Sequence, residues 1–273
     1  MKVMIEVLRV SPSGYYDWLR RRSGESKEAK RLELVQKIEE IHQGSRGTYG
    51  SPRVFKVLKG LGEKCSKSTV ERLMKQNKIR AKTKRRFKVT TDSKHNLPVV
   101  PNILARKFSP ANPNEVWTSD LTYLPTKEGW LFLAVVIDLF SRQVVGWSMS
   151  DRMTTEMVLS SLRMAYFKRK PGKGTIFHSD RGSQYCARDF RDSLAAYGMI
   201  QSQSRKGNCW DNSPTESFFH TLKTEMVHHE VFETRNEAIS KLFEWIEVFY
   251  NRKRIHSTLN YQSPVDYEAA RCQ

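Results

Sequence analysis

Three carboxylates in the second half of the chain stand where a folded protein must pair, ligate or expose their charge. Asp120 lies within residues 117–123, whose β-branched and aromatic side chains predict a strand. Asp180 follows a short apolar stretch and precedes a predicted helix, and open α/β sheets bind ligands at such strand ends. Glu216 lies near the start of a further predicted helix. Because a carboxylate inside a strand is costly unless it is paired or bound to a metal, the three acids are candidate metal ligands.

The chemistry that such acids suggest is cleavage of a phosphodiester bond with the help of two metal ions. That reaction needs carboxylates that bridge and flank two cations about 3.5–4 Å apart. One cation activates the attacking water or 3′-hydroxyl, and the other stabilises the leaving oxygen. Carboxylate oxygens favour Mg²⁺ or Mn²⁺ over Zn²⁺. Each acid alone has a simpler explanation: Asp120 as a strand-edge carboxylate, Asp180 as the cap of the next helix, and Glu216 as a solvated helix residue.

The elements that would position these acids have a mixed α/β pattern. Residues 130–140 form a nearly unbroken apolar run, which is typical of a strand buried on both faces. The short gaps around this run predict three consecutive antiparallel strands, followed by alternating helices and strands. Strands are expected at 116–124, 130–140, 143–149, 175–177 and 200–202, and helices at 153–168, 186–197, 213–226 and 234–250. Asp138 and Arg142 are expected to form a turn and an ion pair between hairpin strands.

The first 110 residues are strongly basic, whereas the rest of the chain is nearly neutral. Of the net charge of +18, residues 1–110 carry +17, from 27 Lys and Arg against 10 Asp and Glu. Residues 111–273 carry +1, from 20 Lys and Arg against 19 Asp and Glu. Solubility does not require such an asymmetry, so we expect a polyanion-binding module attached to a second, neutral unit. Nucleic acid is the polyanion that we infer.

Helical periodicity organises the basic half. Residues 3–23 are expected to form a short helical segment that is broken at 11–14. A better helix is predicted at 27–43, where apolar residues recur at three-residue intervals before Gly44. After a Gly-rich turn, Pro52 favours the first turn of a second helix.

A third helix would be capped by Ser66 or Ser68. Three short helices joined by tight turns match a helix-turn-helix fold. The last helix would then enter the major groove with Lys67, Arg72 and Lys75. A small helical bundle with a solvated basic face fits the same pattern, so the pattern alone leaves both open.

Residues 80–88 are too basic to pack against one another and are expected to follow a phosphate backbone through Lys84, Arg85 and Arg86. Four prolines between positions 98 and 113 mark a linker. The expected domains are an N-terminal helical segment (1–26), a helix-turn-helix DNA-binding domain (27–79), a basic, Pro-containing linker (80–112) and a catalytic core (113–273).

The chain has no apolar run long enough for a membrane span and no signal-like N-terminus. Its four cysteines are scattered without a CxxC pair. We therefore expect a cytoplasmic protein with free thiols, no disulfide framework and no zinc site.

The acids and the segments around them resemble the catalytic core of bacterial insertion-sequence transposases and retroviral integrases, the so-called DDE enzymes. Thirty-five residues separate Asp180 from Glu216, and Lys223 follows seven positions later, as is characteristic of that family. The resemblance covers essentially the whole chain and is greatest with orfB-type, second-frame transposases. Family-like segments lie at 13–16, 49–53, 117–123, 130–147, 178–185, 204–208, 216–219, 222–225 and 250–256.

The resemblance implies a ribonuclease-H-like mixed α/β sheet flanked by helices and preceded by an all-α helix-turn-helix domain. It implies a DNA transposase that cleaves and transfers strands, in which Asp120, Asp180 and Glu216 bind two Mg²⁺ or Mn²⁺ ions. The DNA contacts expected near these ions are made by Arg205, Lys206 and Lys223. The retroviral relatives carry a His/Cys zinc module that this chain lacks, so no zinc cofactor is implied.

The roles of four other family-like residues stay open between the reaction and hydrogen bonds that fix the active-site helices. They are Arg181, Asn251, Arg254 and His256. His178 is expected either to orient Asp180 or to pack in the core.

Double-stranded DNA, as element ends and target, is the expected partner. The resemblance also implies a multimer of the chain on DNA, a possible protein from the upstream reading frame, and a nucleoid-associated location in a bacterial cytoplasm. Three alternatives remain: a non-catalytic or auxiliary DNA-binding regulator derived from a transposase, a nuclease that hydrolyses without joining, and an RNA-binding protein. The last would have no use for the acids.

Overall fold

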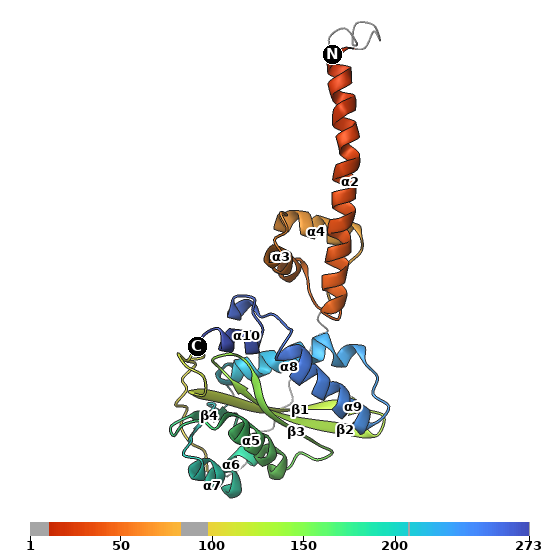
Figure 1. Cartoon of the computed structure of the whole chain (residues 1–273). Helices are drawn as coiled ribbons and strands as arrows, with labels where there is room; N and C mark the ends of the chain where they lie inside the picture. The colour runs from red at the N-terminus through yellow and green to blue at the C-terminus, as the bar shows by residue number, and fades with distance from the viewer. Residues whose placement is uncertain (1–10, 83–97, 207, 273) are drawn as a thin grey trace. The chain divides into compact units, whose positions relative to one another are not determined.

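The structure is a computed structural model that describes residues 11–82, 98–206 and 208–272 (Figure 1). The side chains of residues 20–27 and 209, and the predicted DNA-contacting residues Lys84, Arg85 and Arg86, lie outside the described part. The chain divides into two compact units, Met1–Lys82 and Thr83–Gln273. No helix in the described part is both long enough and apolar enough to cross a membrane.

The first unit contains the helices α2 (Pro12–Gly44), α3 (Ser51–Gly60) and α4 (Lys67–Gln76). Within the predicted break at residues 11–14, Ser11 has an extended backbone, whereas Pro12, Ser13 and Gly14 already belong to α2; the residues before Ser11 lie outside the described part. The Ser11 hydroxyl accepts a hydrogen bond from Gly14 N (3.0 Å), so Ser11 caps the helix, and Pro12 occupies the first turn, where proline is tolerated. The helix continues beyond its first turn because the next proline, Pro52, lies after its end. Gly24, in the interior of α2, costs only about 1 kcal/mol relative to alanine.

The three helices enclose a small apolar core and leave a basic surface on α4. Each helix contributes buried side chains, namely Ile38 from α2, Val54 and Leu58 from α3, and Val70, Leu73 and Met74 from α4. Ser66 caps α4 by accepting a hydrogen bond from Thr69 N (3.1 Å), as predicted. The predicted DNA-contacting residues Lys67, Arg72 and Lys75 are all exposed on α4.

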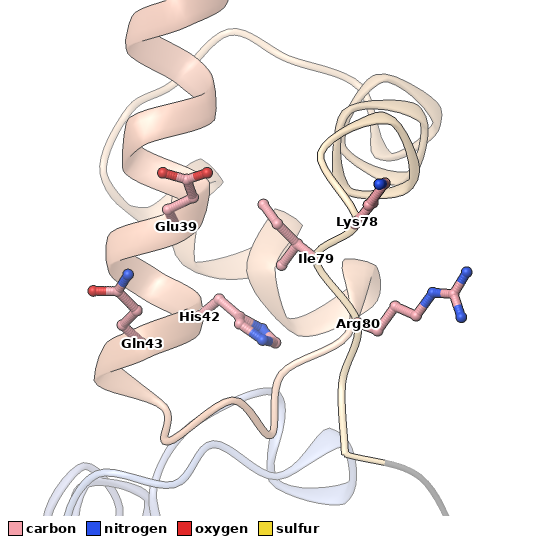
Figure 2. Close-up of a pocket in the computed structure, with 6 residues that line it drawn as sticks. All are labelled: Glu39, His42, Gln43, Lys78, Ile79 and Arg80. Carbon is pink, nitrogen blue, oxygen red and sulfur yellow. The ribbon is translucent and has the colours of Figure 1, made fainter.

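A shallow pocket of about 420 Å³ opens between α2 and the residues that follow α4 (Figure 2). Glu39, His42 and Gln43 line it from α2, and residues 78–80 line it from the other side. Figure 2 shows Ile79 turned toward α2 and Arg80 turned away from it. The chain therefore leaves this unit with its apolar residue packed inward and its basic residues exposed.

The second unit is built on a five-stranded sheet in the order β3-β2-β1-β4-β5. Strands β1 (Val116–Thr126), β2 (Gly129–Asp138) and β3 (Val144–Ser150) form an antiparallel meander, as predicted. Strands β4 (Ile176–Ser179) and β5 (Ile200–Gln203) then extend the sheet in parallel beyond β1. The mixed sheet that the sequence predicts is confirmed.

Helices cover both faces of this sheet, as Figure 1 shows. The faces are separated by the alternation along β2, where Leu133, Val135 and Ile137 join one apolar cluster and Val136 joins the other. One face is covered by α5 (Thr155–Arg169), α6 (Ser183–Cys186) and α7 (Arg188–Ala196). The other is covered by α8 (Ser213–Glu225), α9 (Arg235–Phe243) and the π-helical Glu244–Tyr250. The remaining elements are the 3-10 helices Cys209–Asn212, Val227–His229 and Ser257–Leu259, and α10 (Pro264–Ala269).

The predicted ion pair between Asp138 and Arg142 is wrong. The fully buried Asp138 carboxylate pairs with Arg169 of α5 (3.3 Å) and accepts hydrogen bonds from two backbone N–H groups. Arg142 adopts a left-handed backbone conformation in the turn (φ 60°), and its guanidinium donates to the Phe108 carbonyl (2.8 Å). The turn itself is present, but the two charges find partners outside the hairpin.

Gly146 permits the closest contact between the sheet and α5. A Cβ atom built on Gly146 would lie 2.3 Å from the Ser161 carbonyl oxygen and 2.8 Å from Ala165 Cβ. Because both neighbours belong to one helix, no single side chain can move aside. We predict that Gly146→Ala lowers the free energy of unfolding by about 1–3 kcal/mol, as measured by urea denaturation. The matched control is Gly172→Ala, where nothing lies within 4 Å and no loss is expected; equal losses in both variants would contradict this packing.

Candidate active site

The parallel pairing of β1 with β4 brings Asp120 and Asp180 to equivalent positions on neighbouring strands. Thr118 is paired with His178, and two residues further along each chain lie the two aspartates. Both side chains are half-buried. The Asp180 carboxylate accepts a hydrogen bond from Gly182 N (2.8 Å), whereas α6 begins at Ser183 with Gly182 as its cap residue. Asp180 is therefore not the N-cap of that helix, and the simpler explanation for this acid does not apply.

Glu216 is held beside β1 through the first turn of α8. The Thr215 hydroxyl lies 2.9 Å from the hydroxyl of Thr118, and both residues are buried. Asn212, at the N-cap position of α8, donates to the Ser119 carbonyl (3.3 Å) and accepts from the Thr215 hydroxyl (3.1 Å). These bonds fix the start of α8 against the two residues that precede Asp120. Glu216 follows Thr215 directly, with its side chain exposed.

Burial and like charge together disfavour the ionised form of this set of acids. Burial raises the pKa of Asp120 well above its usual range, and the carboxylates of Asp180 and Glu216 raise it further. Partial shielding from water also raises the pKa of Glu216, although its side chain is exposed. Asp180 and Glu216 thus lie close enough to Asp120 to affect its ionisation. Within the described residues, however, no three His, Cys, Asp or Glu side chains are already arranged to hold a metal ion.

Lys223 adds a cation to the same region. It lies two helical turns after Glu216 on α8, and its ammonium group stands 5.4 Å from the centroid of the Tyr123 ring on β1. Burial lowers the pKa of Lys223, while Asp120 acts in the opposite direction. The lysine is therefore part of the electrostatic environment of Asp120.

Uncharged polar groups contact the residues that precede the two aspartates in the chain. The Tyr185 hydroxyl lies 2.8 Å from that of Ser119, and burial together with the charges of Asp120 and Asp180 raises the pKa of Tyr185. His178 is fully buried, with its ring nitrogens 2.9 Å from Ser202 Oγ and 3.2 Å from Ser204 Oγ. Burial lowers the pKa of His178 to about 4, so the ring is neutral at pH 7. Of the two expected roles, core packing is the one that these contacts support.

Arg205 and Lys206 lie in the loop between β5 and α8, and both are exposed. The Arg205 guanidinium forms an ion pair with Asp211 (2.8 Å). Asp211 is fully buried, and its hydrogen bonds with Arg205 and Arg106 hold the pKa of this carboxyl well below its usual range. Sequence reasoning missed Asp211, whose only local signal is an acid that closely follows two basic residues.

Three other family-like residues connect neighbouring elements of the second unit. The Asn251 side chain exchanges two hydrogen bonds with the backbone of Val144 on β3 (both 3.0 Å). Arg254 pairs with Glu225 at the end of α8 through two bonds of 2.7 Å, and both residues are buried. Arg181 donates to the Ser204 carbonyl (2.7 Å). These contacts support a structural role for all three residues.

Family models match most of the chain. Residues 110–209 and 216–271 match models described as integrase core domain, and residues 29–87 match a model described as HTH-like domain. The first two matches contain Asp120, Asp180 and Glu216, and the third contains α3 and α4.

Two curated relatives match nearly the full chain. A protein called "Insertion element IS600 uncharacterized 31 kDa protein" from Shigella sonnei is 46% identical over 265 residues, which is 97% of each chain. "Transposase InsF for insertion sequence IS3A" from Escherichia coli strain K12 is 41% identical over 269 residues, covering 98% of this chain and 93% of that protein.

A solved structure shares the fold. It is the cryo-electron microscopy structure of a simian T-cell lymphotropic virus intasome in complex with a PP2A regulatory subunit. The match has a TM-score of 0.51 at 16% identity and covers 85% of this chain and 74% of the other. This likeness shows the fold alone, a ribonuclease-H-like integrase core, and confirms the predicted fold class.

The neutral, buried His178 predicts a specific pH dependence of stability. Its folded pKa of about 4 lies below the unfolded value of about 6.5, so the unfolded chain binds more protons between these values and stability falls as the pH is lowered through this window. We expect His178 to account for a loss of about 2 kcal/mol between pH 7 and pH 5. Urea unfolding of His178→Gln, which cannot titrate, should show a correspondingly smaller loss. An equal pH dependence in both proteins would refute the assignment.

Proposed function

The chain belongs to the family of insertion-sequence transposases that includes InsF of IS3, and from this premise we propose that Asp120, Asp180 and Glu216 form its metal-dependent catalytic site. The activity proposed is that of a DDE-type polynucleotidyl transferase, which cleaves a DNA strand and joins the resulting 3′-hydroxyl to a target strand. The observation that carries the proposal is the placement of the three acids: the pairing of β1 with β4 puts Asp120 and Asp180 at matching positions, and the Thr118–Thr215 contact holds the start of α8, with Glu216 on it, against β1.

The donor set fits a pair of hard divalent cations. All three side chains offer carboxylate oxygens, the ligands that Mg²⁺ and Mn²⁺ prefer, and the set contains no sulfur ligand. A cation would also relieve the repulsion that raises the pKa of Asp120, because each carboxylate would then face a positive charge. Glu216 is the exposed member of the set, so its side chain is free to complete the ligand group when a cation binds.

The residues around the acids divide the remaining work. When bound, the two ions supply the charge that activates the attacking oxygen and stabilises the leaving oxygen. Asp120 and Asp180 are fixed by the pairing of their strands, and Glu216 is fixed through Thr215 and Asn212. Such rigid support matters because phosphoryl transfer depends mainly on positioning and on neutralising charge.

Cations on both units are proposed to hold the DNA. On the first unit, Lys67, Arg72 and Lys75 are exposed on α4, the last helix of the region that matches the HTH-like domain. On the second, Lys206 is exposed and Lys223 lies in the electrostatic environment of Asp120. We propose that α4 contacts the duplex and that the second pair contacts the strand at the site.

The same proposal includes the domain limits expected from the sequence, a multimer of the chain on DNA, and a protein from the upstream reading frame. A transposase must bring two DNA ends together, which is the reason to expect more than one copy. The continuity of α2 across residues 26 and 27 means that the N-terminal segment and the first helix of the DNA-binding domain form one element.

Neutralising any one of the three acids should abolish chemistry and spare DNA binding. We predict that Asp120→Asn, Asp180→Asn and Glu216→Gln each lower Mg²⁺-dependent cleavage and strand transfer on the order of 100-fold or more, because each removes a proposed ligand. The substrate is a duplex carrying the terminal sequence of the insertion sequence that encodes the chain, with a precut 3′-hydroxyl end for the joining step. Gel-shift titration measures binding in parallel.

The matched control is Asp192→Asn, which neutralises an exposed aspartate paired with Arg188 on α7. It should leave both reactions unchanged. Full activity in any of the three site variants would overturn the metal assignment. A wild-type chain that binds these ends yet never cleaves them would instead favour the regulator, and cleavage without joining would favour the nuclease.

The α4 surface predicts a change in the salt dependence of binding. Each neutralised phosphate contributes about −0.9 to the slope of log K against log salt concentration. Replacing Lys67, Arg72 and Lys75 by Gln in the full chain should therefore weaken duplex binding and reduce the magnitude of this slope by about 2–3. A control triple variant, Arg163, Arg188 and Lys241 to Gln, alters cations that are ion-paired on the second unit and should preserve the slope. A slope that is unchanged by the α4 substitutions and reduced in the control variant would show that other cations contact the DNA.

A further inference from the structure

We propose that Asp211 is a positioning residue that locks the loop between β5 and α8 and thereby holds Glu216 in place for metal binding. This inference rests on the proposed function and extends it to a residue outside the three acids. Asp211 is fully buried and bonded to two arginines, and its pKa is driven down, whereas the pKa values of Asp120 and Glu216 are raised. Its charge is therefore committed to its neighbours and not to a cation.

Five hydrogen bonds saturate the Asp211 carboxylate. Oδ1 accepts from Arg106 Nε (2.8 Å) and Arg205 Nη2 (2.8 Å). Oδ2 accepts from Asn102 Nδ2 (2.9 Å), Arg205 N (3.0 Å) and Arg205 Nε (2.9 Å). Charge-assisted bonds of this length are about twice as strong as neutral ones, and the set includes a bidentate arginine contact. We call Asp211, Arg205, Arg106 and Asn102 the Asp211 latch.

The latch joins two segments that are about a hundred residues apart in sequence. Arg205 belongs to the loop that leads to α8, whereas Asn102 and Arg106 lie in the first described stretch after residue 97. Arg106 reaches further and donates to the Asn208 side chain (2.9 Å). The stretch is also bonded to β5, because the Ser202 hydroxyl accepts from Ile103 N (2.9 Å) and Leu104 N (3.2 Å). Residues 102–106 therefore hold the loop between β5 and α8 through hydrogen bonds to Asp211 and Asn208.

From the latch, short connections lead to all three acids. Asn212 follows Asp211 directly and binds Ser119 and Thr215, the neighbours of Asp120 and Glu216. At the other end of the loop, the Ser204 carbonyl accepts from Arg181, and the Gln203 side chain donates to the Asp180 carbonyl (3.4 Å). Loss of the latch would therefore release the start of α8, with Glu216 on it, from the two aspartates.

The experiment measures metal affinity directly, independently of DNA and of catalysis. Binding of Mn²⁺ to the full chain is followed by the decrease of the free Mn²⁺ signal in electron paramagnetic resonance. We expect Asp211→Asn, which keeps the shape and removes the charge, to weaken Mn²⁺ binding about tenfold, the effect typical of outer-shell supports. Glu156→Gln, which breaks an exposed ion pair with Arg163 on α5, is the control and should bind like the wild type. Unchanged affinity in a folded Asp211→Asn protein would overturn the inference, whatever its thermal stability.

A second variant keeps the test valid if Asp211→Asn fails to fold. Arg106→Gln removes one partner from the edge of the latch, where its side chain is 43% exposed, and leaves the Arg205 contact in place. It should fold and weaken Mn²⁺ binding by a factor of about three to five, and wild-type affinity in this variant would count against the latch. Asp120→Asn separates the two proposals. If it binds Mn²⁺ like the wild type, the proposed metal site fails; if it loses binding while both latch variants retain it, only the role of Asp211 fails.

Discussion

The parallel pairing of β1 with β4 places two half-buried carboxylates at matching positions, Asp120 within β1 and Asp180 directly after β4, and the candidate site of the second unit depends on that placement. Like charges at such positions repel each other and raise the free energy of the ionised protein. Burial is the main cause of the raised pKa of Asp120, and repulsion from the neighbouring carboxylates raises it further. The sheet tolerates it because both strands are held by their neighbours, β2 on one side and β5 on the other. In our account, this stored repulsion is what gives a divalent cation its affinity for the site.

Hydrogen bonds from neighbouring elements hold the residues next to the acids, and one of the three acids is exposed. Thr118 and Thr215 join β1 to α8 through a buried contact, and the neutral His178 supports the strand that ends at Asp180. Opposite charges are matched away from the acids, as in the buried pair of Arg254 with Glu225. Glu216 alone among the three acids is exposed. The proposed third ligand thus lies on a fixed helix with its side chain exposed, which suits a site that must admit both metal and DNA.

Much of this architecture is readable from the sequence because it depends on local patterns. The nearly unbroken apolar run at 130–140 marks β2, and the spacing of Asp180 and Glu216 predicts the candidate acids. Features set by distant partners are not readable in this way. Asp138 pairs with Arg169 across 31 positions rather than with the nearby Arg142. Asp211 has Arg205 as a partner in its own segment, but Asn102 and Arg106 lie more than a hundred positions earlier, so the local sequence does not reveal them. The continuity of α2 through residues 23–27 was not predicted for a different reason, because Gly24 lies between the two expected helices and weakens a helix without ending it.

The central claim is that Asp120, Asp180 and Glu216 together bind the cations that perform transposition. The most direct measurement is a crystal structure of the chain grown with Mn²⁺ and bound to a duplex, with manganese located by its anomalous scattering. Our account predicts two anomalous peaks about 3.5–4 Å apart, contacted by carboxylate oxygens from all three acids. Manganese bound elsewhere, or at Asp120 and Asp180 with Glu216 turned away, would contradict it.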